Sequence, residues 1–162
     1  MLFRSTDANG DYQVEVPGAL ADGEYTVEAS VRDAAGNSST AQDKGEIDTT
    51  APVITVDAPD GVSTDNTPLI KGHVEGVPAG STVTLVVTDA QGASQTVTAQ
   101  TDANGDYQVE VPGALADGEY TVDASVRDAA GNSSTAQDKG EIDATAPVIT
   151  VDAPDGVSTD NT

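Results

Sequence analysis

Apolar and polar side chains alternate along most of the chain between residues 51 and 143. Alternation with a period of two places successive side chains on opposite faces of the backbone, and it is typical of a β-strand with one buried face. Stretches rich in glycine, proline and aspartate interrupt the pattern and predict turns. The pattern therefore predicts seven strands, at residues 51–59, 68–76, 81–90, 94–100, 106–112, 119–128 and 134–143.

Seven short strands, with no segment that reads as a long helix, favour an all-β fold: an antiparallel β-sandwich of the immunoglobulin type. Segment 134–143 is the most polar of the seven, and we predict that it is an edge strand. The alternating apolar positions predict a core made of Ile54, Val56, Ile70, Val74, Val83, Leu85, Val87, Tyr107, Val109, Val111, Tyr120, Val122, Ala124 and Val126.

The chain repeats itself with an offset of 95 residues. Residues 6–67 match residues 101–162 at 60 of 62 positions, and the two exceptions are Glu28 against Asp123 and Thr49 against Ala144. A period this long suits one small domain per repeat rather than a solenoid, whose repeats are about 20–50 residues long. The sequence therefore predicts a tandem array of similar β-sandwiches.

Two linkers divide the array, because Pro52 and Pro147 restrict the residue before each of them to an extended conformation. The opening MLFRS breaks the repeat and is too short and too polar for a signal peptide, so we interpret it as residues added in cloning. The predicted parts are cloning residues 1–5, the C-terminal part of one repeat at 6–47, a complete repeat at 48–142 and the N-terminal part of the next at 143–162.

The charge is strongly one-sided, with 28 acidic and 6 basic residues and a net charge of -22. Such a chain is not suited to nucleic acid or to an anionic membrane surface, and its charges repel one another unless cations neutralise them. We therefore expect either a protein that lives in high salt or one that binds a divalent metal. The absence of cysteine excludes disulfides and thiolate zinc sites.

The predicted core is thin, because the complete repeat has two aromatic residues, Tyr107 and Tyr120. A small domain with few apolar side chains is only marginally stable on burial alone, and without disulfides a bound metal is the remaining common support. Calcium fits better than magnesium, since it accepts six to eight oxygen ligands in forgiving geometry.

The stretch TDANGDY occurs twice and places Asp102, Asn104 and Asp106 at alternate positions of one turn. An EF-hand begins in the same way, but here Tyr107 replaces the glycine and Gly113 replaces the final glutamate that an EF-hand needs. The stretch is therefore half of a ligand set, and other loops would supply the rest.

Successive antiparallel strands put alternate loops at the same end of a sandwich, which we name the N-terminal pole and the C-terminal pole after the linkers found there. At the N-terminal pole we expect a calcium site made by Asp48, Asp102, Asp106 and Asp128. At the C-terminal pole we expect a second site made by Asp57, Asp60, Asp117 and Asp143. Their counterparts in the first partial repeat include Asp7, Asp11 and Asp33.

A simpler interpretation stays open, because aspartate and asparagine before glycine are ordinary turn formers. Turn formation alone does not explain why residues 48–142 contain 15 acids and 3 bases, a net charge of -12. Catalysis is not predicted. His73, the only histidine, falls on the outward side of its strand, and there is no nucleophile elbow, phosphate loop or tryptophan for stacking a sugar.

Four motifs in order, DTTAP, DANGDY, LADGEYTV and VRDAAGNS, resemble the bacterial immunoglobulin-like repeats of giant surface adhesins, including the repeats-in-toxin (RTX) biofilm adhesins. The resemblance covers nearly all of residues 6–162. It implies an extracellular extender module at the bacterial cell surface, a monomeric unit whose partners are adjacent repeats of the same chain. It also implies calcium-stiffened linkers, with ligands among Asp48, Asp143, Asp102, Asp106 and Asp128.

Three other functions stay open. The first is a module that binds carbohydrate or another protein, although no cluster of exposed aromatic residues or arginine marks such a surface. The second is an accessory domain of a secreted enzyme. The third is a salt-adapted acidic domain without specific metal sites, which any salt would stabilise.

Overall fold

The structure, a computed structural model, describes residues 7–152 and Gly156, so the cloning interpretation of residues 1–5 lies outside it. All regular structure in the described part is β-strand, which confirms the predicted all-β class. The chain divides into two compact units, Met1–Thr50 and Ala51–Thr162, and the division falls inside the predicted linker.

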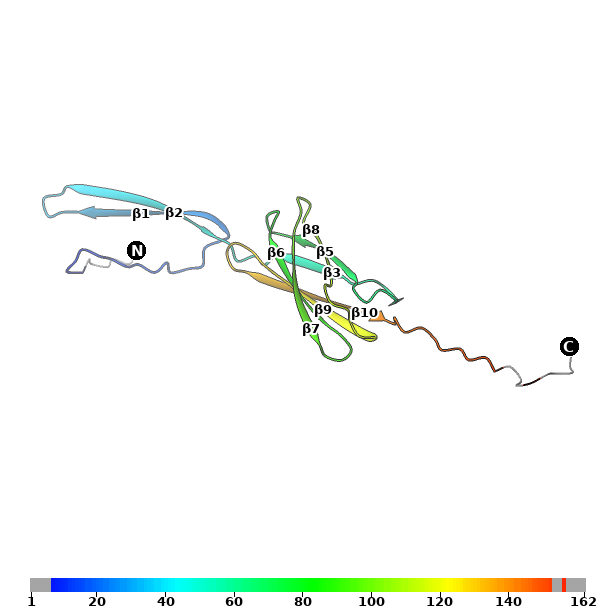
Figure 1. Cartoon of the computed structure of the whole chain (residues 1–162). Coiled ribbons are helices and arrows are strands. Elements are labelled where there is room, and N and C mark those ends of the chain that lie inside the picture. The colour runs from blue at the N-terminus through cyan, green and yellow to red at the C-terminus, as the bar shows by residue number, and fades with distance from the viewer. Residues whose placement is uncertain (1–6, 153–155, 157–162) are drawn as a thin grey trace. The chain divides into compact units, whose positions relative to one another are not determined.

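Unit 1 contains one antiparallel hairpin, formed by β1 (Gly23–Arg32) and β2 (Ser38–Ile47) (Figure 1). The register runs from the pair Gly23 and Ile47 to the pair Arg32 and Ser38. Residues 7–22 form no strand. Unit 1 leaves several large apolar side chains exposed, namely Tyr12, Val14, Val16, Leu20, Val27 and Val31.

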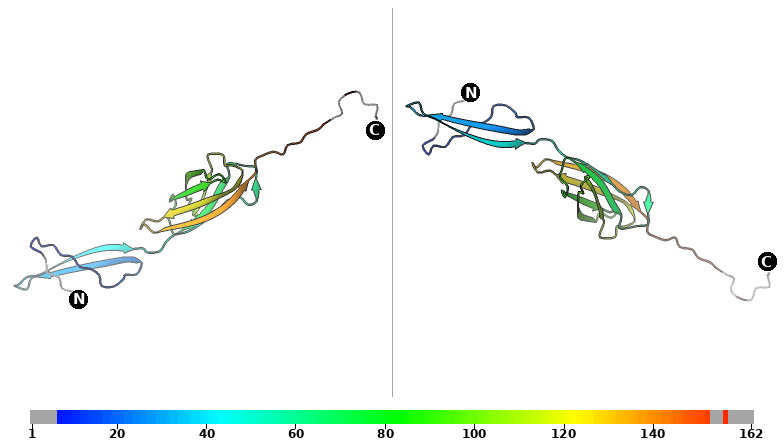
Figure 2. Two further views of the ribbon diagram at one scale, coloured as in Figure 1. Left: turned by 90° about the horizontal axis from the view of Figure 1, so that it is seen from below. Right: turned by 90° about the horizontal axis from the view of Figure 1, so that it is seen from above.

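Unit 2 is a sandwich of two sheets, and Figure 2 shows the two layers from opposite sides. One sheet has five strands in the order β4-β10-β9-β6-β7 and the other has three in the order β3-β5-β8. The strands are β3 (Val53–Asp57), β4 (Val62–Ser63), β5 (Leu69–Glu75), β6 (Thr82–Thr88), β7 (Ser94–Gln100), β8 (Asp106–Glu110), β9 (Gly118–Arg127) and β10 (Ser133–Ile142).

All seven predicted segments contain a strand, and their ends agree to within two residues. The short strand β4 was not predicted, because it lies in a polar stretch that reads as a turn. β4 pairs in parallel with the last two residues of β10, Glu141 and Ile142. The predicted edge position of β10 therefore holds only for the part of the strand before these two residues.

The core lies between the two sheets of unit 2. Every side chain predicted to point inward is buried except Val56 and Val109, which are half-buried and pack against the core. The structure adds six buried apolar side chains that the alternation did not predict, namely Pro52, Ala58, Pro68, Ala99, Leu115 and Ile142. No buried side-chain nitrogen or oxygen in the described residues lacks a hydrogen-bond partner.

The two buried tyrosines each lie over a glycine of the neighbouring strand. Tyr107 pairs in register with Gly72, and Tyr120 pairs with Gly140. A Cβ atom on Gly72 would lie 2.2 Å from the backbone oxygen of Thr55 and 2.4 Å from the Tyr107 ring. Glycine inside a strand otherwise weakens it, so here its small size is what makes room for the ring.

Tyr107 is also tied to the far strand of its sheet. Its hydroxyl donates a hydrogen bond of 2.7 Å to the backbone oxygen of Thr55 in β3. Burial raises the pKa of Tyr107 to about 12. The side chain therefore crosses β5 and joins the two edge strands of the three-stranded sheet.

Candidate functional site

One five-residue loop is built five times in the described chain, always with aspartate first and glycine fourth: residues 7–11, 33–37, 89–93, 102–106 and 128–132. In each loop the N–H of the first residue donates to the carbonyl oxygen of the fifth over 2.8–3.0 Å. The glycine N–H donates to the carbonyl oxygen of the first residue over 3.0–3.3 Å. The glycine φ angles lie between 83° and 100°, which glycine adopts without strain.

The first aspartate of each loop also bonds through its side chain. In all five loops its Oδ1 accepts the backbone N–H of the fifth residue over 2.8–3.0 Å. In the two DAAGN loops, Oδ2 of Asp33 and of Asp128 accepts the side-chain amide of the following Asn37 or Asn132. These five aspartates therefore stabilise their own turns, as the simpler interpretation of the sequence predicts.

These hydrogen bonds favour the charged carboxylate. The bond from the N–H of Asn104 holds the pKa of Asp102 below its usual value. The side chain of Asn132 does so for Asp128, and the N–H of Ala93 does so for Asp89.

Two of the loops, 102–106 and 128–132, lie at the N-terminal pole of unit 2. They follow β7 and β9, whose last residues pair with the beginning of β6. Loop 89–93 lies at the other pole, where Oδ2 of Asp89 accepts the N–H of Ala116 over 3.4 Å. The strand register therefore places loops 102–106 and 128–132 at one pole and loop 89–93 at the other, as expected when successive antiparallel strands put alternate loops at the same end.

Within unit 2, the three members of the N-terminal set, Asp102, Asp106 and Asp128, are not gathered into one centre. Asp102 and Asp128 bond within their own loops. Asp48 belongs to unit 1, where its Oδ1 accepts the N–H of Thr50 over 3.0 Å. Asp106 lies against His73, with 2.8 Å between Oδ1 and Nδ1. Among the described residues no three acidic or histidine side chains lie close enough together to hold a metal ion. The carboxylate oxygens suit calcium chemically, but their spacing here forms pairs rather than a complete set.

His73 is the residue of this region that the sequence did not reveal. It lies between Asp106 and Glu75, with 3.8 Å from its Nε2 to Oε1 of Glu75. His73 and Asp106 are paired in register across β5 and β8, although 33 residues separate them. Only knowledge of that strand pairing would have brought them together.

At the C-terminal pole, Asp117 holds the linker that follows β10. Its Oδ1 accepts the N–H of Ala144 over 2.9 Å, and its Oδ2 accepts the hydroxyl of Thr145. These hydrogen bonds lower the pKa of Asp117, and the bond from the Thr145 hydroxyl has the largest effect. Oδ1 of Asp143 accepts the N–H of Thr145 over 3.3 Å, so Asp117 and Asp143 both bond Thr145 of the linker.

The other two residues of the predicted C-terminal set do not join them. Asp57 ends β3 and pairs in register with Lys71, and Asp60 follows in the exposed loop before β4.

The linker contact recurs in unit 1, where sequence analysis did not single out the aspartate. Oδ1 of Asp22 accepts both the N–H of Thr49, over 3.1 Å, and its hydroxyl, over 2.7 Å. Oδ2 of Asp22 accepts the hydroxyl of Thr50 over 2.7 Å. Because alanine replaces Thr49 at position 144, the second linker has one hydrogen bond fewer, which gives one of the two repeat differences a structural consequence.

We expect acid to destabilise the complete repeat below about pH 4. The carboxyls of Asp89, Asp102, Asp117 and Asp128 have pKa values below the ordinary 3.8 in the folded chain. Between the folded and unfolded pKa values the unfolded chain binds more protons, so the stabilisation is complete above pH 3.8 and is lost as the pH falls through the folded values. Urea midpoints between about pH 6 and pH 2.5 test this, and a constant midpoint would contradict it.

Comparison with known proteins places the chain in a family. The model of the bacterial Ig-like domain matches residues 3–49 and 54–144, which is most of the sequence. The chain belongs to the bacterial Ig-like domain family. The immunoglobulin-like sandwich predicted from the alternation is thereby confirmed. No curated protein matches the chain significantly.

Solved structures similar to this chain include parts of large bacterial adhesins. One is a tetra-tandem repeat in the extending region of a large adhesion protein, with 34% identity, a TM-score of 0.58 and 78% of this chain covered. The chain spans 33% of the length of that protein chain. A Ca²⁺-stabilised adhesin that helps an Antarctic bacterium reach out and bind ice shows 31% identity over 87% of this chain and 38% of its own. Its TM-score is 0.45.

Within the described part of this bacterial Ig-like chain, no helix is long and apolar enough to cross a membrane.

Proposed function

We propose that the chain is an extender of a large bacterial surface adhesin, a spacer that carries a ligand-binding region away from the cell. One observation supports the proposal: in each repeat an aspartate hydrogen-bonds the linker that follows that repeat. Asp22, before β1, bonds Thr49 and Thr50, and Asp117, before β9, bonds Ala144. Hydrogen bonds at the start of the linker fix the direction in which it leaves its repeat. A spacer needs such a fixed direction to stay extended. The likeness to an extending region supports the same role.

The near-identity of the repeats also favours a spacer. A part selected for length can repeat one surface, whereas distinct binding sites need distinct residues. The residues described here offer no clustered exposed aromatic or arginine side chains of the kind that dominate recognition surfaces. The module is extracellular and non-enzymatic, and its partners are neighbouring repeats in the same array.

Calcium is the second part of the proposal. Clustered carboxylates repel one another without metal, and they become ligands when calcium binds. Asp102 and Asp106 belong to one loop, and Asp117 and Asp143 act on one linker, so a small rearrangement of loops would bring each pair onto one ion. The module is stiffest when calcium occupies these places.

Thermal unfolding tests the calcium requirement. Binding to the folded state alone, at a hundredfold excess over Kd, adds about 2.7 kcal/mol, which corresponds to roughly 10–20 °C for a domain of this size. We expect millimolar CaCl₂ to raise Tm by that amount over EDTA. Equal MgCl₂, or NaCl matched for ionic strength, should raise it much less.

Substitutions at the first aspartate of two loops with the same hydrogen bonds separate calcium binding from turn stability. Asp102→Ala and Asp89→Ala both remove a carboxylate that accepts the N–H of the fifth loop residue. Loop 89–93 ends in Ala93 instead of a second acid. Asp89→Ala should therefore lower Tm in EDTA yet keep the calcium response, whereas Asp102→Ala should lose part of it. The calcium-dependent change in Tm of Asp143→Ala then tests whether the linker carboxylate contributes to calcium binding.

If calcium and matched NaCl shift Tm equally in the unaltered chain, the carboxylates are only screened. The chain is then a salt-adapted sandwich, and the calcium part of the proposal is wrong.

A further inference from the structure

The chain's only histidine, His73, has a defined position on the outer side of β5. It pairs in register with Asp106 of β8, and 2.8 Å separate its Nδ1 from Oδ1 of Asp106. The ring also lies beside the loop before β8, because a Cβ atom added to Gly105 would be 3.1 Å from Cε1 of the ring. Two contacts, one with β8 and one with this loop, therefore position the imidazole.

The contact with Asp106 determines which nitrogen of the ring carries hydrogen. An ionised carboxylate only accepts hydrogen bonds, so Nδ1 of His73 must be the donor. A neutral imidazole has a single N–H, and its Nε2 is then left with a free lone pair. Histidines that bind metal ions usually donate their other ring N–H to a carboxylate or carbonyl in the same way, which fixes the tautomer and raises the basicity of the ligating nitrogen. Asp106 thus leaves Nε2 of His73 free to bind a metal ion.

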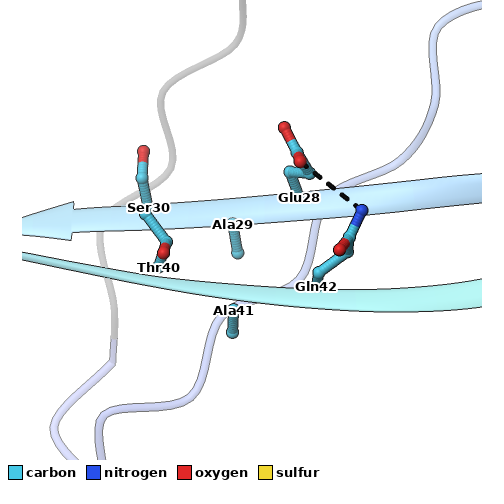
Figure 3. Close-up of a pocket in the computed structure, with 6 residues that line it drawn as sticks. All are labelled: Glu28, Ala29, Ser30, Thr40, Ala41 and Gln42. Atoms are coloured by element: carbon cyan, nitrogen blue, oxygen red, sulfur yellow. Dashed lines mark hydrogen bonds between the residues drawn. The ribbon is translucent and has the colours of Figure 1, made fainter.

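Glu75 lies on the same side of β5 as His73, because residues two apart along a strand project from the same face. Figure 3 shows this on the hairpin of unit 1, where Glu28 and Ser30 point to one side of β1 and Ala29 between them points to the other. Oε1 of Glu75 lies 3.8 Å from Nε2 of His73. The distance is too long for a hydrogen bond, so the free nitrogen and the carboxylate are separated by a gap.

The gap is close to the spacing of two ligands on one transition-metal ion. Zinc binds histidine nitrogen and carboxylate oxygen at about 2.0–2.2 Å, so two ligands of a tetrahedral ion are about 3.4 Å apart. The Glu75 side chain is 73% exposed, and a shift of about 0.4 Å brings its oxygen to this spacing. The His73 side chain is 40% exposed, so water can reach the remaining coordination positions.

We propose that Nε2 of His73 and the carboxylate of Glu75 bind Zn²⁺ or a similar transition-metal ion, and that Asp106 positions the imidazole. The site has two protein ligands, which agrees with the absence of a metal-holding group of three among the described residues. Calcium does not suit it, since calcium takes oxygen ligands whereas imidazole suits zinc and copper. Because the chain has one histidine, we expect one such ion per chain, and the proposal does not rest on calcium at the loops or linkers.

Two protein ligands make a weak site. Structural zinc sites with four ligands bind with a Kd of tens of nanomolar or lower, and half of that binding free energy corresponds to a Kd of about 1–200 µM. Copper should bind more tightly than zinc, as the general order of affinities for divalent metals predicts. A chain with 28 acidic residues also attracts zinc elsewhere, so the measurement must report on the imidazole itself.

Nitrogen NMR of the histidine ring tests the proposal, because a chain with one histidine gives one pair of ring signals. Long-range proton–nitrogen correlation spectra distinguish the N–H nitrogen from the bare one and so identify the tautomer. Without metal we expect hydrogen on Nδ1 and none on Nε2. ZnCl₂ added up to about 1 mM should shift the Nε2 signal until it saturates, with a Kd of about 1–200 µM. Equal CaCl₂ should leave Nε2 unchanged.

Two substitutions and a matched control identify the residues involved. Glu75→Gln should weaken the zinc response of Nε2 at least about tenfold, because it removes a charged ligand. Asp106→Asn should weaken it about 10–100-fold and also populate the tautomer with hydrogen on Nε2. Glu110→Gln removes a carboxylate of β8 about 13 Å beyond Asp106 and should change the Kd less than about twofold. All three side chains are exposed, and circular dichroism checks that the variants are folded.

Three results would overturn the proposal. An Nε2 signal that does not respond to about 1 mM zinc would show that the site does not exist. An equal response to calcium would show that Nε2 senses only the neutralisation of nearby carboxylates. Equal weakening by Glu75→Gln and Glu110→Gln would show that the acidic surface attracts zinc without a specific ligand. The rise of Tm with calcium is measured separately, so none of these results decides whether calcium stiffens the linkers.

Discussion

Replacing Tyr107 by alanine is expected to lower the Tm of the complete repeat by roughly 12–40 °C. Truncating a buried aromatic side chain costs about 3–5 kcal/mol. Tyr107 is 3% exposed and also donates a hydrogen bond to Thr55, so its loss removes core volume and a tie between β8 and β3. In a sandwich with so few aromatic residues, no neighbouring side chain can fill the space. Urea unfolding followed by circular dichroism measures the effect.

The repeat provides the control. Tyr12 stands in the same DANGDYQVEV context but is 60% exposed. Tyr12→Ala should therefore change the main transition by less than about 0.5 kcal/mol, as expected for a surface substitution. Tyr107→Phe isolates the hydrogen bond and should cost about 1 kcal/mol. Equal effects of Tyr12→Ala and Tyr107→Ala would show that burial in unit 2 is not the cause.

Gly140→Ala is expected to destabilise the complete repeat by about 3 kcal/mol, the upper part of the range for overpacking a core. A Cβ atom on Gly140 would lie 2.5 Å from the hydroxyl oxygen of Tyr120, which is 1% exposed and has nowhere to move. Glycine is disfavoured in strands, so an alanine that fitted would stabilise this position. The predicted sign is thus opposite to propensity, and Tm should fall by roughly 12–24 °C.

Gly45→Ala is the matched substitution, since both glycines stand in the sequence STAQDKGEID. Its Cβ atom would meet the Tyr25 ring at the same 2.5 Å, but Tyr25 is only half-buried and can turn outward. We expect a change below about 1 kcal/mol. Similar losses for the two substitutions would place the clash in the hairpin itself rather than in the packed core.

The fold could be predicted well from the sequence because alternation with a period of two records which face of a strand is buried. It identified Ile70, Val83 and Leu85 as core and marked His73 as outward-facing. It did not reveal β4, whose two residues owe their pairing to Glu141 and Ile142 almost eighty residues later. It also gave no account of Gly72, because the need for a glycine depends on which strand lies beside Tyr107.

The candidate site was less accessible, because ligand sets are assembled from separate loops. The spacing within DANGD correctly marked a tight turn, yet it could not show that Asp106 faces His73 or that Asp102 bonds its own loop. Asp117 was singled out for calcium, and its contact with the linker was not foreseen. The internal repeat is most informative at Thr49 and Ala144, where the two copies differ. The Thr49 hydroxyl donates a hydrogen bond to Asp22, whereas Ala144 donates to Asp117 through its backbone N–H alone.

The parallel pairing of β4 with β10 determines how the complete repeat carries tension. Force applied along the chain enters before β3 and leaves after β10, so β3 and its pairing with β5 are loaded first. Once β3 has separated, the force pulls β4 and β10 in opposite directions along their own axes. The pair Glu141 and Val62 and the bond from Asp143 N–H to Ser63 oxygen, at 2.9 Å, then share the load, as does the bond from Ala58 N–H to Asp138. Bonds loaded together in shear must break almost at once, whereas a strand peeled from its end loses them one by one. The two-residue strand β4 thus contributes to the resistance of the complete repeat to unfolding by force.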